Sequence, residues 1–274
     1  MSTRVFPSTQ SATQVEHPEA PHEYEETRGS VLRRRSAAQH GVVITWFATL
    51  LFALTVTVPA LAQDDLDSIK VDPAHHQVVF ENDQVRVVRW VIPVGDKTFN
   101  HSHPNNLSVV LTDYNAKVTT PDGTTDVYLK IGSATWREAG THVVENLGKT
   151  PMTGIIIEPK KPASAPPPGS ADPVAVDPQH QKVQFENEQI RVIRERQSGS
   201  FPMHGHPDNV QVLLTDMNAS LTTSDGKTQT VTGKAGEVRW RTATQHVGKN
   251  LAGKPFEQIV VEMKGAPGAP TGGK

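Results

Sequence analysis

The sequence has no cysteine, few aromatic residues and almost no net charge. Its 274 residues include 5% aromatic residues and carry a formal net charge of −2 at pH 7. Without cysteine the chain forms no disulfide and offers no thiolate, so a bound metal would depend on histidine, carboxylate or amide groups. The near-neutral charge gives no electrostatic signature of nucleic-acid binding, and we expect no nucleic-acid partner.

The N-terminal region has the parts of an export signal. Residues 1–40 are polar and rich in Ser, Thr, Glu and Pro, so we expect a disordered extension there. Three arginines, residues 33–35, then precede the apolar run "GVVITWFATLLFALTVTVPALA", residues 41–62, which ends in small residues as a signal-peptide cleavage site does.

Two outcomes are open for this apolar run. Cleavage after Ala62 would leave Gln63 as the first mature residue. Retention would leave residues 41–62 as a membrane anchor, because about 20 apolar residues can span a bilayer. In either case we predict an exported protein that is periplasmic or extracellular, or membrane-anchored if the segment is retained. Contact with a membrane would then occur only through this segment.

The rest of the chain is an internal duplication. "VDPAHHQVVFENDQVRVVR" begins at Val71, and "VDPQHQKVQFENEQIRVIR" begins at Val176. Further along, "ATWREAGTHVVENLG" at Ala134 matches "VRWRTATQHVGKNLAG" at Val238. A match of this length, in the same order in both halves, indicates two tandem copies of one structural unit.

A segment rich in proline and alanine, "KKPASAPPPGSADP", separates the two copies and is typical of a semi-extended spacer. "GAPGAPTGGK" ends the chain with the composition of a flexible tail. The predicted division is a first domain over residues 71–160, a linker over 161–175, a second domain over 176–264 and a tail over 265–274.

Each copy has the residue pattern of β-strands. Segments such as "VRVVRWVIPV" and "IRVIRERQ" alternate or are rich in β-branched residues. Asp122-Gly123 and Asp225-Gly226 each separate two such segments, as the turn of a hairpin does. No segment after the export signal has a convincing helical period. About eight short strands per copy predict an all-β chain of two small barrels or jelly rolls.

Six of the twelve histidines form matched sets. The sets are His101, His103 and His142 in the first copy and His204, His206 and His246 in the second. Residues at i and i+2 of a strand share a face, so each H-x-H pair presents two imidazoles side by side. If the strand of the third histidine closes on the pair, three imidazoles converge as in a divalent metal site with open positions. The alternative is a polar turn inherited by both copies.

Imidazole ligands suit several divalent transition metals, so the predicted cofactor is Fe, Mn, Ni, Zn or Cu without a choice among them. The remaining histidines of the repeat, His75, His76 and His180, are interpreted as structural or surface groups. Four arginines that recur in both copies are interpreted as outer-face charges or salt bridges, with an anionic substrate as the alternative. They are Arg86, Arg89, Arg191 and Arg194.

The spacing around these histidines resembles the cupin family, and specifically a two-domain cupin. The first cupin motif runs glycine, five residues, H-x-H, three or four residues, glutamate, six residues and glycine; the second ends in histidine, three residues and asparagine. Two residues rather than three or four follow each H-x-H pair, four rather than five follow Gly199, and aspartate stands at the final glycine. The corresponding positions are Gly95, His101, His103, Asn106, Asp113, His142 and Asn146, then Gly199, His204, His206, Asn209, Asp216, His246 and Asn250. The resemblance implies cupin jelly rolls that hold a metal through the six histidines.

The chain departs from the family at the glutamate, where it has Asn106 and Asn209. In the family this glutamate is a fourth ligand and in some members a base. The resemblance makes the two asparagines candidate fourth ligands, or groups just outside the ligands. The alternative is that they only cap the turns after Pro104 and Pro207, as Asn often does.

The resemblance implies a small-molecule substrate or ligand and leaves several functions open. One is a metal-dependent dioxygenase of the quercetinase type, and another is an isomerase of a sugar or keto acid. A third is a non-catalytic bicupin that binds a metal or a small ligand. Catalysis needs a base, and neither copy has a clear one: Glu138 lies close to His142 in sequence, but the second copy has Thr242 there.

Overall fold

The structure is a computed structural model that describes residues 63–162 and 164–264. The predicted extension over residues 1–40, the signal or anchor over 41–62 and the tail over 265–274 lie outside the described residues. Within the described part of the chain, no helix is both long and apolar enough to cross a membrane.

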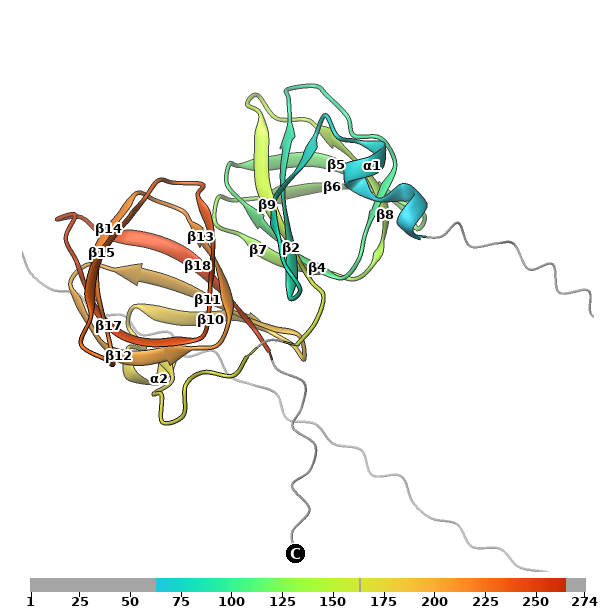
Figure 1. Cartoon of the computed structure of the whole chain (residues 1–274). Coiled ribbons are helices and arrows are strands. Elements are labelled where there is room, and N and C mark those ends of the chain that lie inside the picture. Colours follow the sequence, from blue (N-terminus) through green and yellow to red (C-terminus); the bar gives the residue numbers. More distant parts are fainter. Residues whose placement is uncertain (1–62, 163, 265–274) are drawn as a thin grey trace, which may run out of the picture. The chain divides into compact units, whose positions relative to one another are not determined.

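The first copy forms a barrel of two antiparallel sheets (Figure 1). Its elements are η1 (Gln63–Leu66), α1 (Ser68–Val71), β1 (His76–Glu81), β2 (Val85–Ile92), β3 (His101–His103), β4 (Asn106–Val110), β5 (Tyr114–Thr120), β6 (Gly123–Leu129), β7 (Ala134–Arg137), β8 (Gly140–Asn146) and β9 (Met152–Pro159). One sheet has the order β1-β2-β9-β4-β7 and the other β3-β8-β5-β6. We call residues 76–159 barrel 1.

The second copy repeats this arrangement strand by strand. Its elements are α2 (Pro173–Val176), β10 (Gln181–Glu186), β11 (Ile190–Gln197), β12 (Ser200–His206), β13 (Asn209–Leu213), β14 (Met217–Thr223), β15 (Thr228–Gly233), β16 (Val238–Arg241), β17 (Thr244–Asn250) and β18 (Phe256–Met263). The sheet orders are β10-β11-β18-β13-β16 and β12-β17-β14-β15. We call residues 181–263 barrel 2.

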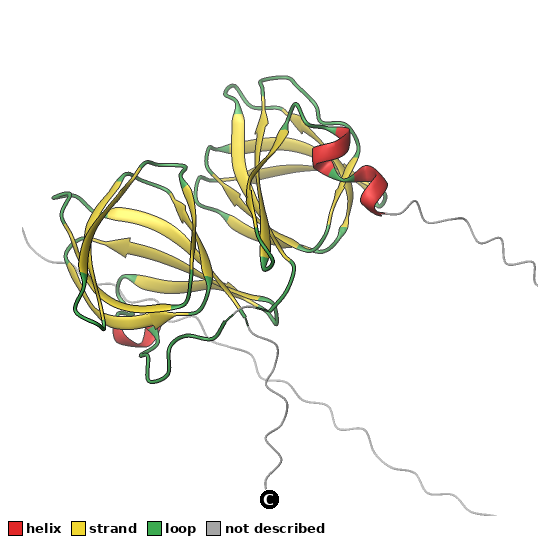
Figure 2. Cartoon of the chain, viewed as in Figure 1, coloured by secondary structure: helices red, strands yellow, loops and turns green. Residues whose placement is uncertain are grey.

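The all-β jelly-roll prediction is confirmed, with nine strands per copy in place of about eight. Figure 2 shows that strands dominate both barrels. The two predicted hairpins also form, β5 with β6 and β14 with β15. Gly123 has a φ of 139° and Gly226 a φ of 82°. Side chains with a Cβ rarely adopt these values, which explains glycine at both turns.

Two single-turn helices precede the barrels, and the sequence pattern did not predict them because one turn is too short to show a period. Asp67 caps α1 by accepting a hydrogen bond from Ile69 N at 3.0 Å. Asp172 caps α2 by accepting from Ala175 N at 2.9 Å. Each capping carboxylate satisfies a backbone N–H that the helix itself cannot, and also contacts an arginine of the site described below.

Candidate metal centre

In barrel 1 the three predicted histidines come together on strands β3 and β8. His101 and His142 are direct partners in the antiparallel register, and their ring centroids are 4.5 Å apart. His103 lies 5.0 Å from His101 and 5.5 Å from His142, measured between ring centroids. The i, i+2 spacing of the H-x-H pair thus places both rings on the inner face of β3, as the sequence predicted.

Barrel 2 repeats the arrangement on β12 and β17. His204 pairs with His246 in the register, with ring centroids 4.6 Å apart. His206 lies 4.9 Å from His204 and 5.7 Å from His246 by the same measure. The three histidines offer ligand nitrogens that all lie within 4.8 Å of one another. We call these three residues cluster 2.

A fourth histidine, His76, joins the group in barrel 1. It is 3% exposed, and its ring centroid is 4.5 Å from that of His101 and 5.6 Å from that of His103. The ligand nitrogens of these three residues lie within 4.8 Å of one another. His76 is therefore not a surface group, as one of the two interpretations had it, and it lies among candidate metal ligands. Cluster 1 consists of His76, His101, His103 and His142.

The neighbouring histidine has the structural role that the sequence predicted. His75 Nδ1 lies 2.7 Å from Asp72 Oδ1, and His180 Nδ1 lies 2.7 Å from Asp177 Oδ1 in the second copy. Adjacent residues of an extended chain point in opposite directions. Which of His75 and His76 points inward depends on where β1 begins, and sequence patterns fix strand ends poorly.

Hydrogen bonds fix the tautomers of His101 and His204. Their Nδ1 atoms each lie 2.8 Å from a backbone carbonyl oxygen, of Phe99 and Pro202 respectively. A carbonyl only accepts, so Nδ1 carries the proton and Nε2 keeps its lone pair. Both Nε2 atoms are buried and have no hydrogen-bond partner among the described residues. A buried lone pair without a donor is the state in which imidazole binds a metal.

The H-x-H histidines His103 and His206 are held by buried glutamates. His103 Nδ1 lies 2.9 Å from Glu158 Oε1, and His206 Nδ1 lies 2.7 Å from Glu262 Oε1. Metal-binding histidines commonly donate their second N–H to a carboxylate, which fixes the ring and raises its basicity. Neither glutamate was predicted from the sequence. A carboxylate at the matching place in two apolar strands, "IIIEP" and "VVEMK", was the signal that could have found them.

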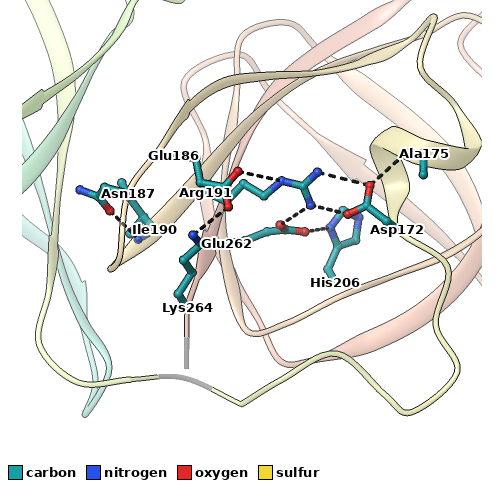
Figure 3. Close-up of polar contacts among 9 residues, drawn as sticks. All are labelled: Asp172, Ala175, Glu186, Asn187, Ile190, Arg191, His206, Glu262 and Lys264. Atoms are coloured by element: carbon teal, nitrogen blue, oxygen red, sulfur yellow. Dashed lines mark hydrogen bonds and ion pairs between the residues drawn. The ribbon is translucent and has the colours of Figure 1, made fainter. Parts of the chain in front are cut away.

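An arginine links each glutamate to the cap of the preceding helix. Arg86 forms ion pairs with Glu158 and, at 2.7 Å, with Asp67 Oδ2. Figure 3 shows the second copy, where Arg191 lies between Asp172 and Glu262. The salt-bridge interpretation is confirmed for these two arginines. Each copy therefore contains one chain of contacts that runs from aspartate through arginine and glutamate to histidine.

These contacts control the charge of the glutamate in barrel 1. Burial alone would raise the pKa of Glu158, but hydrogen bonds from His103 and Arg86 hold that pKa below its ordinary value. Glu158 is consequently a buried anion beside His103.

Five of the clustered imidazoles have a lowered pKa and are neutral at physiological pH. Burial is the main cause that lowers their pKa, and neighbouring imidazoles lower it further. The values fall to about 4 for His101, about 2 for His142, about 3 for His76, about 4 for His204 and about 3 for His246. Neutral rings need not lose a proton from Nε2 before they bind a metal.

The two asparagines at the cupin glutamate position serve the turns. Asn106 Nδ2 donates to Pro104 O and Asn209 Nδ2 donates to Pro207 O, each at 2.8 Å. This contact orients the amide and leaves its oxygen for other uses. Asn209 Oδ1 is buried with no hydrogen-bond partner among the described residues. A role as fourth ligand remains a prediction for both residues.

The interiors of the two barrels differ. In barrel 1 the cavity beside cluster 1 is mostly apolar; its walls include Trp90, Ile92, Val110, Tyr114, Val118, Val144 and Ile156. Trp90 packs over its cross-strand partner Gly154, where a Cβ would overlap the indole ring. In barrel 2 the corresponding cross-strand pair is Glu195 and Gln258, with Gln258 Nε2 donating to Glu195 Oε2 at 2.7 Å.

Comparison with known proteins supports the fold and the family. A solved cupin domain from Bordetella pertussis Tohama I is 30% identical, covers 31% of this chain and 91% of its own length, and has a TM-score of 0.30. A structure of oxalate decarboxylase is 12% identical, covers 70% of this chain and 72% of its own, and has a TM-score of 0.50. AerE from Microcystis aeruginosa is 14% identical over 69% of this chain and 97% of its own, with a TM-score of 0.47. Scans of protein-family models and of curated proteins find no match.

The fold and the site define a tandem jelly-roll protein with a buried histidine cluster in each barrel. The identity to the Bordetella domain, which extends over almost all of that domain, places the sequence in a family. This chain belongs to the cupins, and its two copies make it a bicupin. The likeness to oxalate decarboxylase shows the shared fold only.

Proposed function

We propose that this bicupin binds a divalent transition metal in each barrel through its histidine clusters. The buried Nε2 atoms of His101 and His204, which lack a hydrogen-bond partner among the described residues, carry the proposal. Leaving such a polar atom buried and unmatched costs about 1–3 kcal/mol, and a metal ion would remove that cost. The imidazole donor set suits iron, manganese, nickel, zinc or copper.

Each residue of the site has a defined part in this function. The Phe99 and Pro202 carbonyls and the two buried glutamates hold the imidazole tautomers that leave Nε2 available. Neutral asparagines in place of the cupin glutamate would leave the ion without a charged ligand. A bound metal would supply Lewis acidity toward an oxygen atom of a small ligand.

A metal-dependent dioxygenase of the quercetinase type is the catalytic candidate, and the apolar cavity of barrel 1 favours it. Walls such as Trp90 and Tyr114 exclude water from the metal, and a wider cavity of about 700 Å³ beside His103 and His142 has room for an organic substrate. The alternatives are a bicupin that binds its ligand without turnover and an isomerase of a sugar or keto acid. Dioxygen uptake with flavonols and other enediols, in reloaded and metal-free protein, separates the dioxygenase from both alternatives.

Metal binding is tested by thermal unfolding of the chelator-stripped full chain. Added Zn²⁺ or Mn²⁺ should raise the melting temperature, because a ligand that binds only the native state stabilises it. The shift should shrink when His101 and His103, or His204 and His206, are both replaced by alanine, and disappear when all four are replaced. His180→Ala is the matched control, since His180 pairs with Asp177 outside cluster 2. A shift that survives in the quadruple variant refutes binding by the clusters.

Export is proposed on the N-terminal segment alone. The arginines before residue 41 and the small residues that end at Ala62 support a cleaved signal. The N-terminal sequence of the protein recovered outside the cytoplasm should begin at Gln63. Recovery in the membrane fraction with residues 41–62 intact supports the anchor, and recovery in the cytoplasm alone contradicts export.

A further inference from the structure

The two clusters differ at one matched position. His76 is the first residue of β1, and Gln181 is the first residue of β10. Both strands have the same burial pattern and the same register with the following strand, so the two residues occupy equivalent places. All the other histidines of cluster 1 have a histidine counterpart in cluster 2.

His76 lies beside two of the predicted ligands of barrel 1. Its ligand nitrogen lies within 4.8 Å of those of His101 and His103, a set that does not include His142. His142 is placed next to this set by its pairing with His101, whose ring centroid is 4.5 Å away. His76 Nδ1 lies 3.3 Å from the carbonyl oxygen of Asp72, which only accepts. The proton therefore sits on Nδ1, and the Nε2 lone pair is available to a metal. This is the same backbone-carbonyl arrangement that fixes His101.

Gln181, at the equivalent place in barrel 2, supplies an amide and no imidazole. It is 0% exposed, and neither its amide nitrogen nor its amide oxygen has a hydrogen-bond partner among the described residues. A buried amide with both atoms unmatched destabilises a fold more than an apolar side chain of the same size. Its presence indicates that something else in the interior of barrel 2 satisfies it, and the oxygen of an amide is a weak, hard metal ligand.

We propose that the barrels hold metal unequally, with four imidazoles including His76 in barrel 1 and three imidazoles beside the Gln181 amide in barrel 2. Barrel 1 is then the tighter site and the one selective for Cu²⁺, Ni²⁺ and Zn²⁺, the ions that gain most from imidazole. Barrel 2 is the weaker site, with a ligand position left to an oxygen donor, and discriminates less against Mn²⁺ and Fe²⁺. This inference rests on the proposed metal binding by both clusters.

The preceding residues, His75 and His180, show that the difference between the barrels is confined to the side chains of His76 and Gln181. His75 and His180 are also matched, and each contacts an aspartate at the same distance of 2.7 Å. The backbone that carries position 76 and position 181 is therefore held alike in both barrels. His76→Gln and Gln181→His each place in one barrel the side chain that the other barrel already accommodates. A change in metal affinity in these variants therefore reports the loss or gain of an imidazole rather than a change of the backbone.

The experiment is a calorimetric titration of the chelator-stripped full chain with Zn²⁺. Wild type should bind two equivalents of Zn²⁺, one in a tight phase and one in a weak phase. His76→Gln should weaken the tight phase by at least about tenfold, since even the loss of a group that only supports a ligand costs roughly 10–100-fold in affinity. Gln181→His should tighten the weak phase by a similar factor. His75→Gln should leave both phases in place.

Cu²⁺ electron paramagnetic resonance gives a readout independent of affinity. At one equivalent of Cu²⁺, the nitrogen hyperfine pattern of wild type should change in His76→Gln and stay the same in Gln181→His. Circular dichroism of each variant verifies that it is folded.

Two results overturn the inference without touching the proposed function. One is a tight phase and a copper spectrum that His76→Gln leaves unchanged. The other is a tight phase that His204→Ala removes and His101→Ala spares, which would place it in barrel 2. A wild-type chain that binds no Zn²⁺ and no Cu²⁺ would instead refute the proposed function, so the two failures are distinguishable.

Discussion

His103 Nδ1 lies 2.9 Å from Glu158 Oε1 in the interior of barrel 1, and the same contact joins His206 to Glu262 in barrel 2. The cupin first motif has lost its glutamate in both copies, where it has asparagine. A carboxylate from the last strand is nevertheless present in each site. It contacts Nδ1 of a histidine and so orients the ring.

Replacing this carboxylate should weaken metal binding. Glu158→Gln keeps an oxygen that accepts from His103 but removes the charge, and we expect the affinity of barrel 1 for Zn²⁺ to fall about 10–100-fold. Glu262→Gln should have the same effect on barrel 2. Calorimetric titration of the stripped chain measures both. Glu81→Gln is the control, because Glu81 pairs with Lys160 away from the cluster. Unchanged affinity in both variants would show that the glutamates only pack against the rings.

Removing the arginine that pairs with Glu158 should destabilise barrel 1. Arg86 contacts both Glu158 and Asp67, so Arg86→Gln leaves a buried carboxylate with one partner fewer. We expect a loss of roughly 3 kcal/mol in the free energy of unfolding, measured with urea. Lys130→Ala, which breaks an exposed ion pair with Asp113, should cost less than about 1 kcal/mol.

A double variant separates the unpaired charge from lost packing in the Arg86 test. When Glu158→Gln is added to Arg86→Gln, the charge is gone and most of the lost stability should return. If the double variant is less stable than Arg86→Gln by the full cost of Glu158→Gln alone, the two residues are not coupled and the pairing argument fails.

Acid should destabilise the metal-free protein. Histidine in an unfolded chain has a pKa near 6.5, while His101 and His204 have a pKa of about 4 in the fold. Between these values the unfolded state binds more protons, so the stability present above about pH 6.5 is lost as the pH falls toward 4. Urea midpoints of stripped protein at pH 8, 6 and 5 should decrease in that order. A midpoint that is flat or rises on acidification would contradict neutral, buried rings.

Ionisation of Glu195 should make the stability depend on pH in the direction opposite to that of the histidines. Burial raises its pKa, so its contribution to stability is present below the unfolded value and is lost as the pH rises through the folded value. Glu195→Gln removes the ionisable group and keeps an oxygen to accept from Gln258. The variant should gain stability over wild type at pH 8 and gain less at pH 5, as thermal unfolding at both values measures. A gain of equal size at the two values would exclude the ionisation of Glu195 as its cause.

The duplicated sequence predicted the jelly rolls and the two H-x-H clusters because local patterns determine both. Alternating strands give the sheets, and i, i+2 spacing places His101 and His103 on one face. His76 could not be distinguished from His75 in the same way, since one residue of uncertainty in the start of β1 reverses the inward side chain. Glu158 approaches His103 only through the pairing of β9, which lies far along the chain.

The asymmetry between the barrels also escaped prediction, although its residues are plain in the sequence. Trp90 and Glu195 occupy the same place in β2 and β11. Whether each side chain can be buried there depends on its cross-strand partner, Gly154 or Gln258. Gly154 leaves room for the indole, and Gln258 donates to the carboxylate. Such compensation becomes visible only when strands distant in sequence are paired.

The central claim is that the histidine clusters of both barrels bind a divalent transition metal. Elemental analysis of the full chain, stripped with chelator, reloaded with Zn²⁺ or Mn²⁺ and freed of excess by gel filtration, tests this claim most directly. We predict two equivalents of metal per chain in wild type, one when His101 and His103 are both replaced by alanine, one when His204 and His206 are both replaced, and none when all four are replaced. Wild type without metal, or a quadruple variant that still holds two equivalents, would contradict it.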